Sequence, residues 1–194
     1  MGGPVRIPSL YRSTRSQGVI LARGSGLAAT IVEARVQETS IEGPLPGRWQ
    51  RLALDQVNQQ FSVQLPVVAG RFYRVEIKST NTLGKPQSFT IQHVGVGEVF
   101  VIAGQSNSTN YGEIPHTTQT GMVTTFSGTE WSLANDPNPA YRDNSSKGSF
   151  IPSLGDALYR RYHVTIGIPS VGHGSTSGLL WAEKVSQYLD TSLC

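Results

Sequence analysis

One serine of this chain stands where a hydroxyl group could act as a nucleophile. The apolar run at residues 99–103 gives way to the tetrapeptide Gly104-Gln105-Ser106-Asn107. Such a run is typical of a buried strand, and open sheets with helix crossovers bind ligands just beyond the carboxyl ends of their strands. Ser106 is therefore a candidate nucleophile. The same four residues also have ordinary turn composition, in which a serine bonds to nearby backbone.

The order of two segments resembles a family of hydrolases. Gly104-Gln105-Ser106-Asn107 after an apolar strand is similar to the first sequence block of the SGNH (GDSL-like) hydrolase superfamily, in its sialate O-acetylesterase-like carbohydrate esterase branch. Residues 148–181 are similar to the same branch, and the match in order and spacing covers about residues 94–181, ending at Trp181. The resemblance implies a serine-dependent carboxylic ester hydrolase that removes O-acetyl groups from sugars.

The resemblance also implies roles for individual residues. Ser106 would attack the acyl carbonyl, and the backbone N–H groups of Ser106 and Gly174 would form the oxyanion hole. Related esterases more often have Gly-Gly-Thr where this chain has Gly174-Ser175-Thr176, so Gly172 and Ser175 stay open as alternative donors. The candidates for substrate binding are Gln105, Asn107, His173 and Trp131.

The base that such chemistry requires is not evident. A serine hydroxyl must lose its proton to a neighbouring base, normally an imidazole that is oriented by a carboxylate. In the family an Asp-x-x-His near the C-terminus supplies this pair, and a further block supplies an asparagine donor. No Asp-x-x-His occurs in the 194 residues, and His173 is only a weak candidate for the base. We therefore expect a truncated domain, inactive alone unless a missing C-terminal segment or a second chain completes it. The alternative is a catalytically inactive fragment that acts as a carbohydrate-binding or structural module.

The first half of the chain has the two-residue period of half-buried strands. Apolar and polar residues alternate at 61–67 and 73–77, and similar alternation occurs at 29–36 and 49–54, with turn signals between them. Several short strands of this kind predict an antiparallel β-sandwich-like domain over residues 1–93. Trp49, Phe72 and Tyr73 fall within these patterns, so we expect them in the core rather than on a sugar-binding platform.

The second half changes to a helical period. Pro152 suits the first turn of a helix over residues 152–162, a buried strand is predicted at 164–168, and a second helical pattern runs from Leu180 to Leu189. Strands that alternate with helices indicate a parallel sheet. We predict that residues 94–194 are the N-terminal portion of an SGNH esterase domain, α/β in class, an incomplete flavodoxin-like fold with parallel strands. The polar stretch at 109–149 is expected to be a functional loop, which Trp131 and Tyr141 either anchor or equip with a sugar subsite.

Composition limits the other classes of function. The formal net charge is +3, and the basic residues are scattered, without the runs expected of a nucleic-acid surface. No apolar stretch is long enough to cross a membrane, and the single cysteine, Cys194, excludes an intramolecular disulfide. Histidines and carboxylates lack metal-ligand spacing, and no cofactor is implied. The resemblance suggests an extracellular or periplasmic protein, although residues 1–4 do not open a secretory signal.

Overall fold

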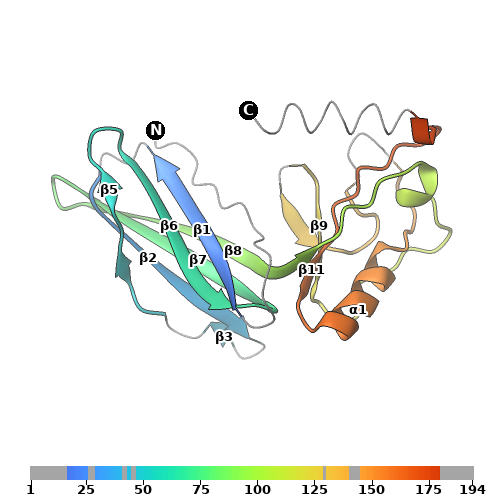
Figure 1. Ribbon diagram of the computed structural model, residues 1–194, viewed down its shortest axis with the longest axis horizontal. Coiled ribbons are helices and arrows are strands. Elements are labelled where there is room, and N and C mark those ends of the chain that lie inside the picture. The colour runs from blue at the N-terminus through green and yellow to red at the C-terminus, as the bar shows by residue number, and fades with distance from the viewer. Residues whose placement is uncertain are drawn as a thin grey trace. The chain divides into compact units, whose positions relative to one another are not determined.

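The computed structural model describes residues 17–25, 29–40, 43–44, 47–128, 130–139 and 145–179. The chain divides into two compact units, Met1–Glu98 and Val99–Cys194 (Figure 1). Tyr141, Trp181 and the helical pattern predicted between Leu180 and Leu189 lie outside the described residues.

Unit 1 contains two antiparallel sheets. The first consists of β1 (Gln17–Ser25), β6 (Gln60–Val68) and β5 (Leu54–Asp55), in the order β1-β6-β5. In the second, β7 (Arg71–Asn81) lies between β2 (Ala29–Ser40) and β8 (Pro86–Val99). The short strands β3 (Gly43–Pro44) and β4 (Gln50–Arg51) pair with β2.

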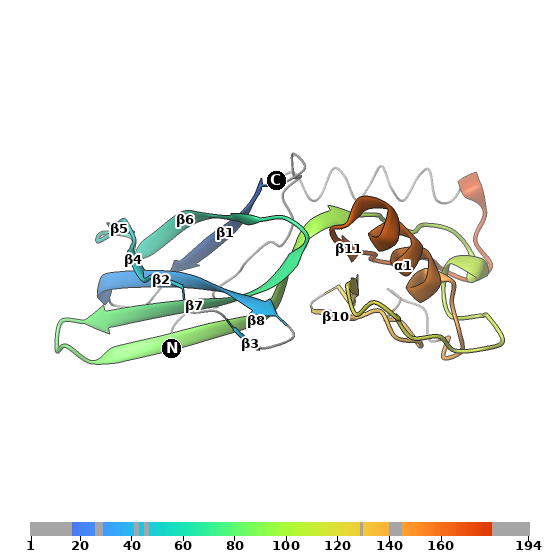
Figure 2. The same cartoon turned by 90° about the horizontal axis from the view of Figure 1, so that it is seen from below.

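The two sheets share one hydrophobic core. Because successive side chains of a strand point to opposite faces, every second residue of each long strand faces inward. Buried residues from both sheets therefore meet, among them Ile20, Phe61, Leu65, Val32, Val75 and Ile77. Figure 2 shows unit 1 as two layers, with β1 and β6 in one and β2, β7 and β8 in the other.

The tryptophan of unit 1 departs from the expectation of a core position. Phe72 and Tyr73 are buried, but Trp49 is 37% exposed. It precedes β4, and the Arg35 guanidinium lies 4.6 Å from the centre of its ring. The alternation at 49–54 is interrupted between β4 and β5, so its period does not assign this ring to the core.

The described part of unit 2 has a mixed sheet with an α-helix beside it. β9 (Val123–Phe126) pairs antiparallel with β10 (Trp131–Leu133) and parallel with β11 (Thr165–Gly167). The helix α1 (Ile151–Tyr162) lies against β9 and β11 (Figure 1). Its contact with β9 is close: a Cβ at Gly155 would lie 2.2 Å from Cγ1 of Val123. Val123, Ile151, Ile166 and Ile168 form the centre of the unit's core.

The predicted fold class is wrong. The described residues are mostly β, with α1 as their one α-helix, and the sheet of unit 2 is mixed. The chain therefore has a β-rich fold, not an α/β flavodoxin-like domain with parallel strands. The helix predicted from Pro152 and the strand predicted at 164–168 are observed as α1 and β11. The buried strand expected at 99–103 is not observed: beyond the end of β8 this run has only an isolated bridge at Ile102, and Val101 is 63% exposed. In unit 2 the prediction fails at residues 109–149, because this stretch was expected to be a loop and contains strands β9 and β10.

No helix among the described residues is long and apolar enough to span a membrane.

Candidate active site

Ser106 opens a single turn of 3-10 helix, η1 (Ser106–Ser108), and its side chain is half-buried. Hydrogen bonds hold this turn on both sides. The Gln105 carbonyl accepts from the N–H and the hydroxyl of Ser108, at 2.9 and 2.6 Å. The Ser106 carbonyl accepts from the N–H and the hydroxyl of Thr109, at 3.0 and 2.8 Å. The backbone that carries the candidate nucleophile is therefore fixed by its own side chains.

Parallel pairing places this turn beside the second glycine-rich loop. Ile102 donates its N–H to the Pro169 carbonyl at 3.0 Å and accepts from the Val171 N–H at 2.9 Å. Two residues further along each segment, the His173 N–H donates to the Gly104 carbonyl at 2.9 Å. The two loops thus leave the carboxyl ends of neighbouring parallel segments and remain in contact.

The Ser106 turn and the loop through Gly172 are closely packed. A Cβ at Gly172 would lie 2.1 Å from Oγ of Ser108 and 2.6 Å from Cγ2 of Thr109, so only glycine fits against the turn. The buried Ser170 hydroxyl donates to the Ser108 carbonyl at 2.6 Å. A buried hydrogen bond between residues so distant in sequence fixes their relative position because leaving its acceptor unpaired would be costly.

The predicted oxyanion donors lie at the end of this loop. The Gly172 N–H is buried and faces the Ser170 hydroxyl at 3.4 Å, which disfavours it as a donor to a substrate. Gly174 is half-buried, and Ser175 is exposed with φ 59°, in the left-handed region that favours glycine. Gly174 stays the predicted donor, with Ser175 as an alternative.

No base is hydrogen-bonded to the candidate nucleophile in the part of the chain that is described. The hydroxyl of Ser106 has no hydrogen bond to another described residue. His173 is anchored beside Gly104 through its backbone, and its side chain is exposed. The other three histidines lie elsewhere. His93 belongs to β8 and has φ 54°, His116 ends the Gly112–His116 segment, and His163 is the C-cap of α1.

The predicted substrate-binding residues are placed in two different environments. Gln105 and Asn107 flank Ser106 and are exposed. Trp131 belongs to β10, with its ring 5.0 Å from that of Phe126, and a Cβ at Gly167 would lie 2.9 Å from it. Its contacts are therefore those of a side chain that anchors β10 on the sheet.

Asp136 holds together part of the stretch at 109–149, and sequence reasoning did not identify this residue. Its carboxylate accepts from the N–H groups of His116 and Ser149, each at 2.8 Å. It also accepts from the Ser149 hydroxyl at 2.7 Å and the Asn138 side-chain amide at 2.6 Å. The run of turn-forming residues at 135–139 was the available signal, but it does not reveal the partners.

A second carboxylate, Asp156, fastens the segment before β9 to α1. It is buried and accepts from the hydroxyls of Thr118 and Thr120, at 2.7 and 2.5 Å, and from the Gln119 N–H at 2.7 Å. Burial raises the pKa of Asp156, but the hydrogen bonds from Thr120, Gln119 and Thr118 outweigh it and hold the pKa below its ordinary value.

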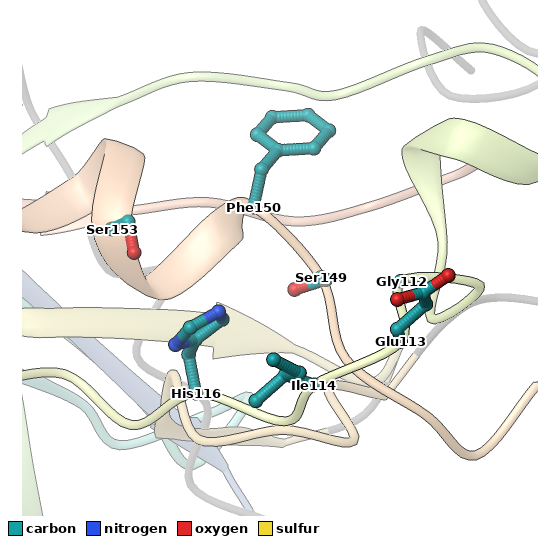
Figure 3. Close-up of a pocket in the computed structure, with 7 residues that line it drawn as sticks. All are labelled: Gly112, Glu113, Ile114, His116, Ser149, Phe150 and Ser153. Carbon is teal, nitrogen blue, oxygen red and sulfur yellow. The ribbon is translucent and has the colours of Figure 1, made fainter.

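A pocket of about 430 Å³ lies between the segment Gly112–His116 and the start of α1 (Figure 3). Glu113, Ile114, His116 and Ser153 are among the side chains that line it. Among the described residues, no group of three or more histidine, cysteine or acidic side chains is placed to hold a metal ion.

The fold is similar to that of part of a carbohydrate acetylesterase. The solved structure is the crystal structure of XAC1771, a novel carbohydrate acetylesterase from Xanthomonas citri, with a TM-score of 0.53 and 16% sequence identity. The alignment covers 90% of this chain and 41% of that chain, so this chain spans about two fifths of the length of the acetylesterase. No family model and no curated protein sequence matches the chain.

Proposed function

We propose that this chain supplies the nucleophile and the oxyanion-binding loop of a carbohydrate esterase that removes O-acetyl groups from sugars. One observation carries the proposal: the Ser106 turn and the loop through Gly174 leave neighbouring parallel segments and are locked together by Ser170 and Gly172. The likeness of fold to a carbohydrate acetylesterase supports the substrate class. The resemblance of the two loops to the sialate O-acetylesterase-like SGNH hydrolases supports the serine mechanism.

The reaction would proceed through an acyl-enzyme. The Ser106 hydroxyl oxygen attacks the acetyl carbonyl carbon while its proton passes to a base. The backbone N–H groups of Ser106 and Gly174 stabilise the negative charge on the tetrahedral oxygen. The carbon–oxygen bond to the sugar then breaks, and the departing sugar oxygen takes the proton from the base. Water cleaves the acetyl-serine by the same steps, which releases acetate and restores the hydroxyl of Ser106.

The base and its orienting carboxylate are assigned to a polypeptide segment beyond these residues. All four histidines belong to the described part of the chain, and none is hydrogen-bonded to the Ser106 hydroxyl there. The chemistry requires no cofactor from this chain.

The Ser106 hydroxyl has no hydrogen bond to another described residue, and this observation also favours a second candidate function. A serine turn without a base is expected in a carbohydrate-binding or structural module that keeps the loop geometry but performs no catalysis. The two functions differ in whether Ser106 is reactive when a base is provided.

Chemical rescue distinguishes the two functions. The folded chain is incubated with a fluorophosphonate, with and without added imidazole as an external base, and the adduct is located by intact mass and peptide mapping. We expect a single adduct on Ser106 whose rate of formation rises with imidazole. The adduct disappears in Ser106→Ala and persists in Ser132→Ala, which alters an exposed serine in β10. A folded chain that forms no Ser106 adduct under either condition contradicts the esterase and supports the non-catalytic module.

A further inference from the structure

The pocket between Gly112–His116 and the start of α1 has walls that are fixed at both ends. At one end, Gly112 and Gly148 exchange backbone hydrogen bonds of 2.7 and 3.0 Å. At the other end, Asp136 accepts from the backbone N–H groups of His116 and Ser149 and donates its own N–H to the His116 carbonyl at 2.8 Å. A pocket held in this way is preformed, so a ligand would not have to order it.

Glycine allows one wall to approach the other. A Cβ at Gly148 would lie 1.9 Å from the Ile114 carbonyl oxygen, which leaves no space for any other residue. The resulting volume, about 430 Å³, falls within the range of small-molecule sites.

The side chains around the pocket combine hydrogen-bonding groups with apolar surface. Glu113, His116 and Ser153 are exposed, and none of their side chains is hydrogen-bonded to another described residue. Ile114 and Phe150 are 67% and 45% exposed. Figure 3 shows the side chains of Ile114, His116 and Ser153 around the space at the start of α1, with the Phe150 ring directed away from His116.

These groups match the chemistry of a sugar ring. A carboxylate, an imidazole and a hydroxyl can each bond to a ring hydroxyl, while the exposed Ile114 side chain can cover part of the C–H surface of the ring. Binding pockets commonly combine a few placed polar groups with an apolar lining in this way.

The charge of the lining selects among sugars. Glu113 is the one formally charged side chain among the described residues that line the pocket, and no lysine or arginine lies among them. A sugar that carries a carboxylate would bring a second negative charge beside Glu113 without a cation to balance it, which disfavours binding.

We infer that this pocket binds one uncharged sugar unit and discriminates against acidic sugars such as sialic acid. The choice of a carbohydrate ligand rests on the proposed function, and the inference deepens it: the sugar that this chain recognises is neutral. Glu113 is then the residue that determines this specificity.

Binding is measured by titrating the isotope-labelled chain with neutral methyl glycosides of glucose, galactose, mannose and xylose, and with N-acetylneuraminic acid, while backbone amide signals are followed by NMR. We expect at least one neutral glycoside to saturate, with shifts concentrated at Glu113, His116 and Ser153, and N-acetylneuraminic acid to bind more weakly. Tighter binding of the acidic sugar, shifts confined to other residues, or no saturable binding of any neutral glycoside would overturn the inference.

Two variants test the role of Glu113 against a matched control. Glu113→Gln should weaken binding of the neutral glycoside by about tenfold, because a charge-assisted hydrogen bond is lost. It should also narrow the discrimination against N-acetylneuraminic acid. Glu130→Gln, which alters an exposed carboxylate near β10, should change neither quantity. Equal effects of the two variants would contradict the assignment.

The test is independent of ester cleavage. Ser106→Ala should bind the neutral glycoside like the unaltered chain. Sugar binding without Ser106 reactivity would contradict the proposed esterase function and support the sugar-binding pocket. Ser106 reactivity without sugar binding would contradict the sugar-binding pocket alone.

Discussion

Close contacts of Gly172 and a hydrogen bond of Ser170 hold the loop through Gly174 against the Ser106 turn. Gly172 faces the Ser108 hydroxyl and the Thr109 methyl group so closely that its hydrogen atom occupies the only space available. The Ser170 hydroxyl donates a hydrogen bond to the carbonyl of Ser108. The position of the candidate nucleophile therefore depends on small residues whose own chemistry takes no part in the reaction.

We predict that Gly172→Ala destabilises the chain. Its methyl group would force apart the Ser108 turn and the loop, and overpacking of this kind costs about 1–3 kcal/mol. Chemical denaturation measures the change. Gly178→Ala is the matched control, because no atom lies within 4 Å of its added Cβ, and it should change the free energy of unfolding little. Equal effects of the two substitutions would refute the packing argument.

The buried carboxylate of Asp156 should make stability depend on pH. Its pKa in the folded state is held below the ordinary value by hydrogen bonds from Thr120, Gln119 and Thr118, which outweigh burial. Since the folded pKa is the lower one, the stabilisation is fully present above the unfolded pKa of about 3.9 and is lost as pH falls through the folded pKa.

Replacing this carboxylate should flatten that dependence. Asp156→Asn loses a hydrogen-bond acceptor to several donors, which should cost about 1–3 kcal/mol at neutral pH. The cost should shrink in acid, where the unaltered chain also loses the interaction. Unfolding free energies across the acid range measure both effects, with Glu130→Gln as an exposed control. A cost that stays constant with pH would show that the carboxylate charge is not responsible.

At the scale of elements, periodicity indicated some strands and not others: β8, the longest at 14 residues, was not among the strands predicted. The alternation at 61–67 and 73–77 corresponds to β6 and β7, and the helical spacing after Pro152 corresponds to α1. Strands β9 and β10 were missed because they are short and occur in a stretch rich in threonine and serine. Their pairing partners are supplied by tertiary structure, which no local pattern contains.

For the candidate site, too, local sequence patterns could be read, but long-range contacts could not. Ser106 and the loop through Gly174 could be proposed from the sequence, because each follows an apolar segment and resembles a known block. The contacts through Ser170 and Gly172 could not, because they join residues about sixty positions apart. The Asp136 network was likewise invisible, since turn-forming residues give no indication of their long-range partners.

We predict that α1 requires glycine at position 155 because α1 packs closely against β9 there. Gly155→Ala would gain about 1 kcal/mol of helix propensity, but its methyl group would lie 2.2 Å from Cγ1 of Val123. Because overpacking costs about 1–3 kcal/mol, we expect net destabilisation in thermal or chemical unfolding. Val123→Ala should relieve this clash, so the double variant should be more stable than the sum of the single effects predicts. Strict additivity would contradict the contact.

At the scale of the whole molecule, each of the two units has a hydrophobic core of its own. The candidate nucleophile, the glycine-rich loop and the pocket at the start of α1 all belong to the second unit. The likeness to the carbohydrate acetylesterase extends over 90% of this chain but only 41% of that chain. The proposed function assigns to this chain the nucleophile and the oxyanion donors.

The central claim is that Ser106 forms the covalent intermediate, and trapping that intermediate tests it most directly. The chain is mixed with p-nitrophenyl acetate and imidazole, quenched in acid at short times, and analysed by peptide mass spectrometry. We predict an acetyl group on Ser106 that disappears on longer incubation and is absent from Ser106→Ala. Acetylation that is confined to other side chains, or that is unchanged by Ser106→Ala, would contradict the account.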